Sequence, residues 1–406
     1  NTRKPAEFVG KRKGVNDNVT IQNATATNVP VKLNQHIHVS FLIRDGEESK
    51  SMKSLVDEYM RPAMLAEART IDQILLGQFI QFRANAAGSL GGMSGTNAKE
   101  YILDTRKVMN DKKVPTAGRN MIWNTDSETQ ALNTEIFLTA DKVGDDGTAL
   151  REASMGRKLG FNHFMSQNMS FIEASSVDTA DAGAINAGNL TKGSTVLTVD
   201  QFGAAIPNNS WIKVAGSGVH RVMSTTGGST PTEITIESPG LTRDIVDNAV
   251  VTPADPGAVN LAAGYAVDYD AYIEFDGFTN APVAGQSVTL GTSTTSPVYT
   301  IIEISGTTML LDRPLEAALS DNDAINPIPQ GGYNFALDHG ALALVMRPLA
   351  APREGTGALS AVASYNGLGM RAVITYDGDK QGHLVTLDVL AGVKVLDTDR
   401  GAVLYG

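Results

Sequence analysis

The sequence contains no cysteine, and only six of its 406 residues are histidines. The lack of cysteine excludes a disulfide framework, thiolate metal ligands and a cysteine nucleophile. There is no run of about eighteen apolar residues, so we expect no membrane-spanning segment, and no signal peptide is visible. A chain of this length without disulfides must gain its stability from packing or from oligomerisation.

Motifs of catalysis and nucleotide binding are also missing. The sequence has no GxxxxGK[ST], no GxGxxG between a strand and a helix, and no GxSxG. The loop "DKVGDDG" (141–147) is similar to a calcium loop, but Val143 stands where an oxygen ligand is needed. We therefore expect no enzyme, no catalytic residues, no cofactor and no metal site.

Charge is distributed unevenly along the chain, whose net charge is −11. Residues 1–44 carry seven bases against two acids, whereas residues 176–330 carry seventeen acids against five bases. A basic beginning and an acidic middle indicate surfaces that meet different partners.

The first 83 residues read as an extended arm followed by a helix. "NVTIQ" (18–22) and "HIHVSFLI" (36–43) alternate like the two strands of a hairpin, which holds too little apolar material to be stable alone. Residues 51–83 are predicted to be helical, with Pro62 at a helix start or a kink. One apolar stripe recurs at helical spacing: Met64, Ala68, Ile71, Leu75, Phe79 and Phe82.

Two further helix starts are marked by capping residues. Asn97 with Glu100 predicts a helix to about Asn110, and Thr125 with Glu128 forms a capping box for a helix to about Phe137.

From about residue 176 to 330, short alternating strands separated by turn residues predict an all-β region. It divides near residue 256 into two halves of similar texture, which is only weakly a repeat. After it, "LDHGALALVMRPL" (337–349) reads as a short helix. Residues 367–396 read as a hairpin with "DGDKQG" as its turn, and "GAVLYG" (401–406) as a last strand.

Two groups of polar residues are candidates for binding. His36 and His38 lie on one strand face, but no third metal ligand occurs at a recognisable spacing, and a zinc site needs at least three. The cluster Lys11, Arg12 and Lys13 suits nucleic acid or an acidic protein surface, and equally a solvated loop tip.

Seven stretches resemble, in their order, the major capsid proteins of tailed bacteriophages, namely coat proteins of short-tailed phages with the Hong Kong-97 fold and an inserted β domain. They are "VKLNQHIHVSFLIRD", "SLVDEYMRPAMLAEARTIDQILLGQF", "ILDTRKVMNDKKVP", "GRNMIWN", "GRKLGFNHFMSQNM", "YNFALDHGALALVMRPL" and "HLVTLDVLAGVKVLDTDRGAVLYG". The resemblance covers most of the chain outside 176–330 and departs from the family in that the β insertion is double.

The resemblance implies an α+β capsid fold with an extended hairpin loop, a long spine helix, peripheral and axial domains and inserted all-β modules. The expected domains are an extended loop or arm (1–48), spine helix and peripheral domain (49–175), a first β insertion (176–255), a second β insertion (256–330), and an axial domain with terminal strands (331–406).

It further implies a protein that self-assembles into the icosahedral head shell around a double-stranded DNA genome. The implied partners are other copies of the chain in hexamers and pentamers, with scaffolding and portal proteins during assembly; a decoration protein is left open, and no membrane is involved. The implied location is the virion, and the host cytoplasm during assembly. The candidate inter-subunit contacts are Lys11, Arg12, Lys13, His36, His38 and Arg44.

A second interpretation stays open beside this one. The acidic Gly/Ser/Thr-rich strands also suit a secreted or cell-surface β-rich binding protein, such as a carbohydrate binder or a tail-fibre component. A hydrolase is a third option, and no constellation of residues supports it.

Overall fold

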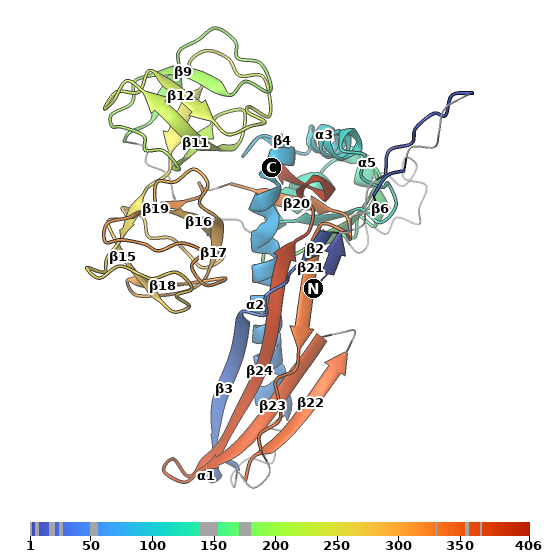
Figure 1. Cartoon of the computed structure of the whole chain (residues 1–406), viewed down its shortest axis with the longest axis vertical. Coiled ribbons are helices and arrows are strands. Elements are labelled where there is room, and N and C mark those ends of the chain that lie inside the picture. The colour runs from blue at the N-terminus through green and yellow to red at the C-terminus, as the bar shows by residue number, and fades with distance from the viewer. Residues whose placement is uncertain are drawn as a thin grey trace. The chain divides into compact units, whose positions relative to one another are not determined.

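The computed structural model describes residues 2–4, 8–15, 21–23, 27–48, 56–138, 153–169, 180–329, 331–353, 357–365 and 368–406 (Figure 1). The chain divides into two compact units. Unit one comprises Asn1–Glu48 and Leu342–Leu396, and unit two comprises Ser49–Ala341 and Asp397–Gly406. Strands outnumber helices, so the expected mixed α and β architecture with all-β modules is confirmed. None of the described helices is long and apolar enough to cross a bilayer.

Unit one is built on a five-stranded antiparallel sheet. Its longest strand, β24, pairs with β3, β21 and β23. The expected hairpin with the DGDKQG turn is confirmed, because β23 and β24 pair from Arg371 to Asp377 around it. The strands are β3 (Gln35–Arg44), β21 (Leu342–Arg347), β22 (Leu359–Tyr365), β23 (Leu368–Asp377) and β24 (Gly382–Val395), and the short helix α1 (Asp45–Glu48) follows β3.

The hairpin expected between residues 18–22 and 36–43 is not seen in its described part, because Ile21 and Gln22 lie in no strand. β3 pairs with β24 over ten residues instead, from Gln35 with Ala391 to Arg44 with Gly382. The alternating apolar side chains of β3 match those of β24, and such a long partner strand outcompetes a short arm. β1 (Thr2–Lys4) pairs with β2 (Thr27–Val29), and residues 16–20 lie outside the described part of the chain.

The helix expected over residues 337–349 is also wrong. Leu342–Arg347 forms β21 and lies in register along the end of β24, from Leu342 with Val395 to Arg347 with Leu390. The local sequence is rich in Ala and Leu and favours a helix by propensity, but pairing with an existing sheet overrides that weak preference.

Unit two begins with a continuous helical spine. A π turn (η1, Val56–Met60) leads into α2 (Arg61–Gly77), and a 3-10 segment (η2, Gln78–Asn85) continues it. Pro62 lies in the first turn of α2, so it starts the helix rather than kinking it.

Only the last two residues of the expected apolar stripe, Phe79 and Phe82, are buried. Phe79 packs on Tyr333 with ring centroids 5.1 Å apart, and Phe82 packs on Phe335 at 5.0 Å. Met64 is 44% exposed, so the prediction of one buried stripe is wrong for the first turns of α2. The tighter 3-10 winding, with about three residues per turn, places Phe79 and Phe82 above one another on the sheet.

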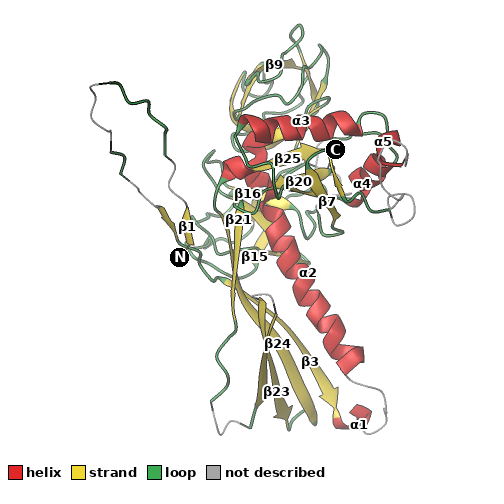
Figure 2. Cartoon of the chain, turned by 90° about the vertical axis from the view of Figure 1, so that its right-hand side faces the viewer, coloured by secondary structure: helices red, strands yellow, loops and turns green. Residues whose placement is uncertain are grey.

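A six-stranded mixed sheet forms the centre of unit two, in the order β4-β25-β20-β5-β7-β6. Helix α3 lies across one face of this sheet (Figure 2). There Tyr101, Ile102 and Met109 pack on Met121 and Trp123. The other face receives η2 through its phenylalanines. The strands are β4 (Ala86–Gly88), β5 (Asn120–Trp123), β6 (Arg157–Lys158), β7 (Phe161–Met165), β20 (Tyr333–Leu337) and β25 (Gly401–Tyr405); the helices are α3 (Ala98–Asp111), α4 (Thr125–Leu132), α5 (Glu135–Leu138) and η3 (Thr398–Arg400).

The helix starts are nearly as expected, but their caps differ. The side chain of Asn97 accepts from Ser94 N at 2.7 Å and donates to Gly92 O at 2.7 Å, so it holds the preceding loop rather than capping α3. Helix α4 is capped by Asn124, which accepts from Ser127 N at 2.7 Å. The capping box expected at Thr125 is therefore wrong by one residue.

Between β7 and β20 the chain forms two closed six-stranded barrels. Each barrel has its own apolar core. Barrel one contains β8 (Gly183–Ile185), β9 (Val196–Asp200), β10 (Trp211–Val214), β11 (Val219–Thr226), β12 (Glu233–Ile236) and β13 (Val250–Pro253); barrel two contains β14 (Gly257–Val259), β15 (Ile273–Asp276), β16 (Ser287–Leu290), β17 (Val298–Ser305), β18 (Thr308–Leu311) and β19 (Ala324–Pro327).

The two barrels are structural duplicates. When the six strands of each barrel are numbered in chain order, both closed rings read third, fourth, fifth, second, first and sixth. The register shifts at the same place in both, between Val222 and Ser224 and between Ile301 and Glu303. Asn248 and Asn322 each have a positive φ, of 62° and 63°, before the sixth strand. The weak repeat seen in the sequence is thus a tandem repeat of one barrel topology.

Candidate assembly surfaces

Both barrels are tied to the spine by carboxylates at equivalent positions. Glu237 directly follows β12, and Asp312 directly follows β18. Arg83 donates from Nε to Glu237 Oε2 at 2.7 Å and from Nη2 to Oε1 at 2.9 Å, which makes a bidentate ion pair. Gln78 Nε2 donates to Asp312 Oδ2 at 3.0 Å. The duplicated carboxylate therefore anchors each barrel to the end of the spine.

The second of these carboxylates lies in a closed environment. Asp312 is 2% exposed, and it also accepts from the backbone N–H of Thr300 at 3.0 Å and from Arg313 at 3.0 Å. Burial raises the pKa of Asp312, and the Arg313 charge opposes that rise. The satisfied hydrogen bonds mark it as a structural anchor.

A buried polar junction joins the two barrels. Trp211 Nε1 donates to Thr289 Oγ1 at 3.1 Å, and Thr289 Oγ1 donates to Asn209 O at 3.2 Å. Arg221 donates from Nε to Asn209 Oδ1 at 2.8 Å and from Nη2 to Ser296 O at 2.8 Å. Burial lowers the pKa of Arg221 to about 10. Because these partners come from both barrels and are buried, the barrels form one joined pair.

A serine–histidine pair in barrel one resembles a nucleophile and its base. Ser217 Oγ lies 2.9 Å from His220 Nε2 and 2.9 Å from Thr242 Oγ1, and Thr242 donates to Gly88 O at 2.8 Å. Ser217 and His220 are buried, and burial lowers the pKa of His220 to about 4. A hydroxyl closed off in this way cannot meet a substrate, so the group links barrel one to β4. No local pattern in the sequence indicates this group.

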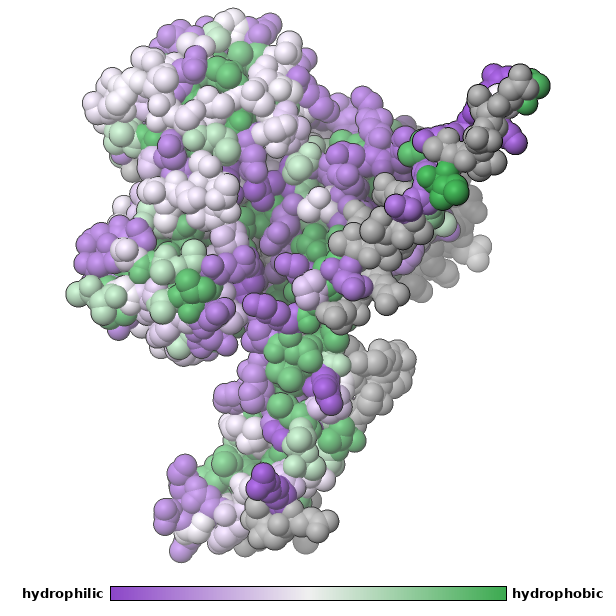
Figure 3. Space-filling view, in the orientation of Figure 1, coloured by the Kyte–Doolittle hydropathy of each residue, from purple (hydrophilic) through white to green (hydrophobic). Residues whose placement is uncertain are grey.

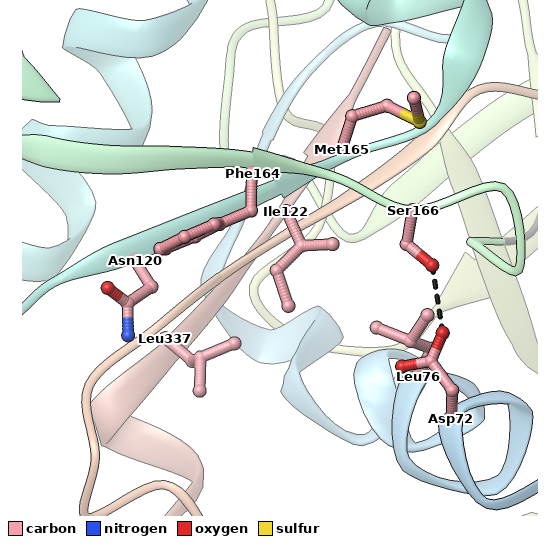
Figure 4. Close-up of a pocket in the computed structure, with 8 residues that line it drawn as sticks. All are labelled: Asp72, Leu76, Asn120, Ile122, Phe164, Met165, Ser166 and Leu337. Atoms are coloured by element: carbon pink, nitrogen blue, oxygen red, sulfur yellow. Dashed lines mark hydrogen bonds between the residues drawn. The ribbon is translucent and has the colours of Figure 1, made fainter. Parts of the chain in front are cut away.

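A hollow of about 330 Å³ lies between α2 and the strands β5, β7 and β20 of the central sheet (Figure 4). Asp72, on the spine, accepts from Ser166 Oγ at 2.9 Å and from Asn168 Nδ2 at 2.7 Å. Phe164 and Met165 on β7 are exposed. A satisfied carboxylate above an apolar floor suits packing rather than catalysis. The lining residues are Asp72, Leu76, Asn120, Ile122, Phe164, Met165, Ser166 and Leu337.

The expected contact residues lie in unit one and are exposed. His36 and His38 share one face of β3 with ring centroids 6.4 Å apart, and Arg44 ends the same strand. Lys11, Arg12 and Lys13 belong to a different segment, residues 8–15, so the structure forms two separate groups rather than one site.

No described group of three or more His, Asp or Glu residues could hold a metal. That His36 and His38 bind no metal stays a prediction. The calcium-like loop at residues 141–147 lies outside the described part of the chain.

The large apolar side chains with the highest exposure lie mainly in unit one. Among the described residues, six of them are more than 60% exposed, and five of these six belong to unit one. They are Phe8, Val9, Val15, Ile21 and Leu359, and the sixth is Val246. Four of them lie on the short segments 8–15 and 21–23, which contain no buried residue.

Comparisons with known proteins give low similarities. No protein-family model matches the sequence, and no curated protein sequence matches it. Among solved structures, the chain is similar to one from Mycobacterium phage Che8 (TM-score 0.41, 11% identity, covering 95% of this chain and 76% of that one). It is also similar to a chain from a capsid structure of the cyanophage P-SCSP1u (TM-score 0.43, 10% identity, 99% and 81%) and to one from the mature capsid of bacteriophage PhiM1 (TM-score 0.31, 11% identity, 62% and 80%).

Proposed function

We propose that the chain is the major capsid protein of a tailed bacteriophage and that it self-assembles into an icosahedral shell enclosing double-stranded DNA. The observation that carries the proposal is that five of the six most exposed large apolar side chains of the described residues lie in unit one. Phe8, Val15 and Ile21 sit on a segment with no apolar core of its own, so another surface has to cover them. Other copies of the same chain are the simplest such surface.

The order of elements supports a Hong Kong-97 type of fold for the chain. A long extended strand (β3) precedes the spine, a helix lies on a small central sheet, and the β modules are inserted between β7 and β20. The terminal strands then complete both sheets. The same order carries the family resemblance of the sequence, and this proposal includes its division into arm, spine with peripheral domain, two β insertions and axial domain.

The proposed role needs no chemistry. Burial of apolar area contributes about 25 cal/mol per Å² before the costs of association. Several modest contacts per subunit become strong when a closed lattice multiplies them, while wrongly placed subunits can still leave. The proposed partners are other copies in hexamers and pentamers, with scaffolding and portal proteins during assembly in the host cytoplasm. The residues proposed to form contacts between copies are Lys11, Arg12, Lys13, His36, His38 and Arg44.

The alternative of a free β-rich binding protein has less support. A chain of independent binding domains would be separated by flexible linkers. These barrels are instead joined through Trp211 and Thr289 and anchored to the spine through Glu237 and Asp312.

Electron microscopy and sedimentation of the purified chain test the proposal. We expect closed shells of uniform diameter, alone or with a co-expressed scaffolding protein. A protein that sediments as a monomer at every concentration, with or without its scaffold, contradicts it. A variant with Phe8→Ser and Ile21→Ser removes exposed apolar groups without touching a core. It should therefore fold normally but assemble poorly. Its matched control is Val246→Ser, which changes a similarly exposed apolar residue of unit two.

A further inference from the structure

The two barrels share one topology but differ in charge. Barrel one, residues 183–253, holds five acids and four bases, whereas barrel two, residues 257–327, holds nine acids and one base. Because barrel one folds with the same strand order and the same bulge, the excess of acids in barrel two is not a requirement of the fold.

Matching backbone hydrogen bonds align the two barrels residue by residue. Val199 N donates to Thr232 O in barrel one, and Phe275 N donates to Thr307 O in barrel two, which aligns β9 with β15. The shared bulge aligns Ser224 with Glu303. The resulting pairs, with the barrel-one residue first, are Gly193 with Asp268, Ser194 with Tyr269, Val196 with Tyr272, Thr198 with Glu274 and Ser224 with Glu303.

These five residues of barrel two form one exposed surface, here termed the acidic face. Tyr272 OH donates to Glu303 Oε2 at 2.8 Å, and Tyr269 OH donates to Tyr272 O at 3.3 Å, so the loop before β15 contacts a side chain of β17. Hydrophilic atoms gather at the left-hand edge of barrel two in the space-filling view (Figure 3). Barrel one has small or uncharged residues at every corresponding position.

The chain also contains the complement of this face. Residues 8–15, here termed the basic arm, read FVGKRKGV and carry three cations and no acid. Phe8 is 62% exposed and Val9 is 69% exposed. The side chain of Gln22 accepts from Val9 N at 3.0 Å and donates to Val9 O at 2.6 Å, which keeps the apolar end of the arm extended.

We propose that the acidic face of barrel two binds the basic arm of a second copy of the chain. The proposal rests on the proposed shell function and names one contact within it. Lys11, Arg12 and Lys13 supply the charge that Asp268, Glu274 and Glu303 attract, and a guanidinium or ammonium group can stack on the exposed tyrosine rings. Barrel one lacks both the charge and the rings, so the duplicated barrels have separate roles: barrel two receives the arm and barrel one does not.

Cross-linking between two differently labelled chains tests the contact. The chain has no cysteine, so each introduced cysteine is unique. One chain carries Lys11→Cys and the other carries Glu274→Cys; they are mixed, assembled and treated with a short bismaleimide. The matched control replaces Glu274→Cys by Thr198→Cys, the corresponding position in barrel one. We expect several-fold more mixed dimer with Glu274→Cys than with the control, and less as salt rises, because salt screens exposed charges.

A second variant tests the charges themselves. Glu274→Thr with Glu303→Ser gives barrel two the residues that barrel one already carries, so the barrel should still fold. For this measurement the variant chain carries its cysteine as Asp268→Cys and the other chain carries Lys11→Cys. Their cross-linking should be roughly tenfold lower than without the two glutamate substitutions, since each lost pair of partly exposed charges weakens the contact modestly. Arg12→Glu in the arm should lower it in the same direction.

The outcomes separate this contact from the shell function. Shells that form while Glu274→Cys and Thr198→Cys cross-link equally overturn the arm contact and leave the shell function standing. If a dilute chain that carries both Lys11→Cys and Glu274→Cys cross-links within itself, the arm binds the acidic face of its own chain, and the proposal of a second copy as the partner is wrong. A chain that never assembles overturns both.

Discussion

Glu237 and Asp312 occupy the same position in the two barrels, and both accept hydrogen bonds from the spine, Glu237 from Arg83 and Asp312 from Gln78. The repeat therefore keeps its anchoring carboxylate while the donor changes from a charged to a neutral group. The barrels meet the spine at donors five residues apart in sequence, so the spine positions both barrels at once.

The Arg83–Glu237 pair should contribute measurably to stability. Its side chains are 19% and 32% exposed, and both hydrogen bonds are short. We expect a coupling free energy of about 1–2 kcal/mol, between that of an exposed pair and that of a buried charged hydrogen bond. A double-mutant cycle with Arg83→Met and Glu237→Gln, read by chemical denaturation, measures it. The exposed Lys112–Asp399 pair is the control, and we expect less than about 1 kcal/mol there; equal couplings would contradict the docking role.

Two buried histidines should make unit two sensitive to acid. Burial lowers the pKa of His163 and of His220 to about 4, from an ordinary 6.5. His163 accepts from Trp123 Nε1 at 2.9 Å, which holds it neutral in the folded state. Below pH 6.5 the unfolded chain takes up these protons and the folded chain does not, so stability falls until about pH 4. Each histidine can remove up to about 3 kcal/mol, at about 1.36 kcal/mol per pKa unit.

Denaturation midpoints between pH 7 and pH 4 check this. His163→Gln keeps an acceptor and a donor and should flatten the pH dependence by roughly half, since one of two such histidines is removed. The exposed His38→Gln is the control and should leave the slope as it is. A slope that is the same in all three proteins refutes the assignment.

The paired barrels should fold without the rest of the chain. Residues 180–329 hold two closed barrels, two cores and the buried junction between them. Trp211 is the only tryptophan in this fragment, and it is buried at the junction. We expect dispersed amide signals for the fragment and blue-shifted Trp211 emission. Residues 180–255 alone should give redder emission, because Thr289 and its neighbours no longer cover the ring; identical emission would mean that the junction is not formed.

The barrels should lie on the outer face of the proposed shell. Residues 176–330 carry seventeen acids against five bases. Inside the shell this charge would face packed DNA across the whole inner surface, and screening over about 8 Å would only weaken the repulsion. Outside, it would keep particles apart and soluble. A density map of filled particles decides this, and barrels that project into the lumen would show that the charge argument is wrong.

The elements that could be predicted from the sequence are those that depend on a local pattern of residues. The β23–β24 hairpin was predictable because alternating residues flank a turn from Gly378 to Gln381. Alternation likewise predicted the barrel strands. The helix expected at 337–349 failed because strand pairing with β24 lies almost fifty residues away, beyond the reach of a local pattern.

The barrel repeat and its anchors depend on distant contacts. The halves keep the same backbone but few of the same side chains, such as Asn248 and Asn322 at a positive φ, so the repeat is clear only in three dimensions. Arg83 and Glu237 are separated by 154 residues, and Gln78 and Asp312 by 234. The cluster Lys11, Arg12 and Lys13 is visible in the sequence because a run of like charges needs no distant partner to be recognised, and its role as a contact stays a prediction.

The length of β24 has a mechanical consequence. Ten consecutive residues of β24 are in register with β3, and the strand also pairs with β21 and β23. Interstrand hydrogen bonds run perpendicular to an antiparallel strand. A pull along β24 therefore strains these bonds in shear, all at once, instead of opening them one after another. A wall built from such sheets would stretch little before it broke, which suits a container under outward pressure.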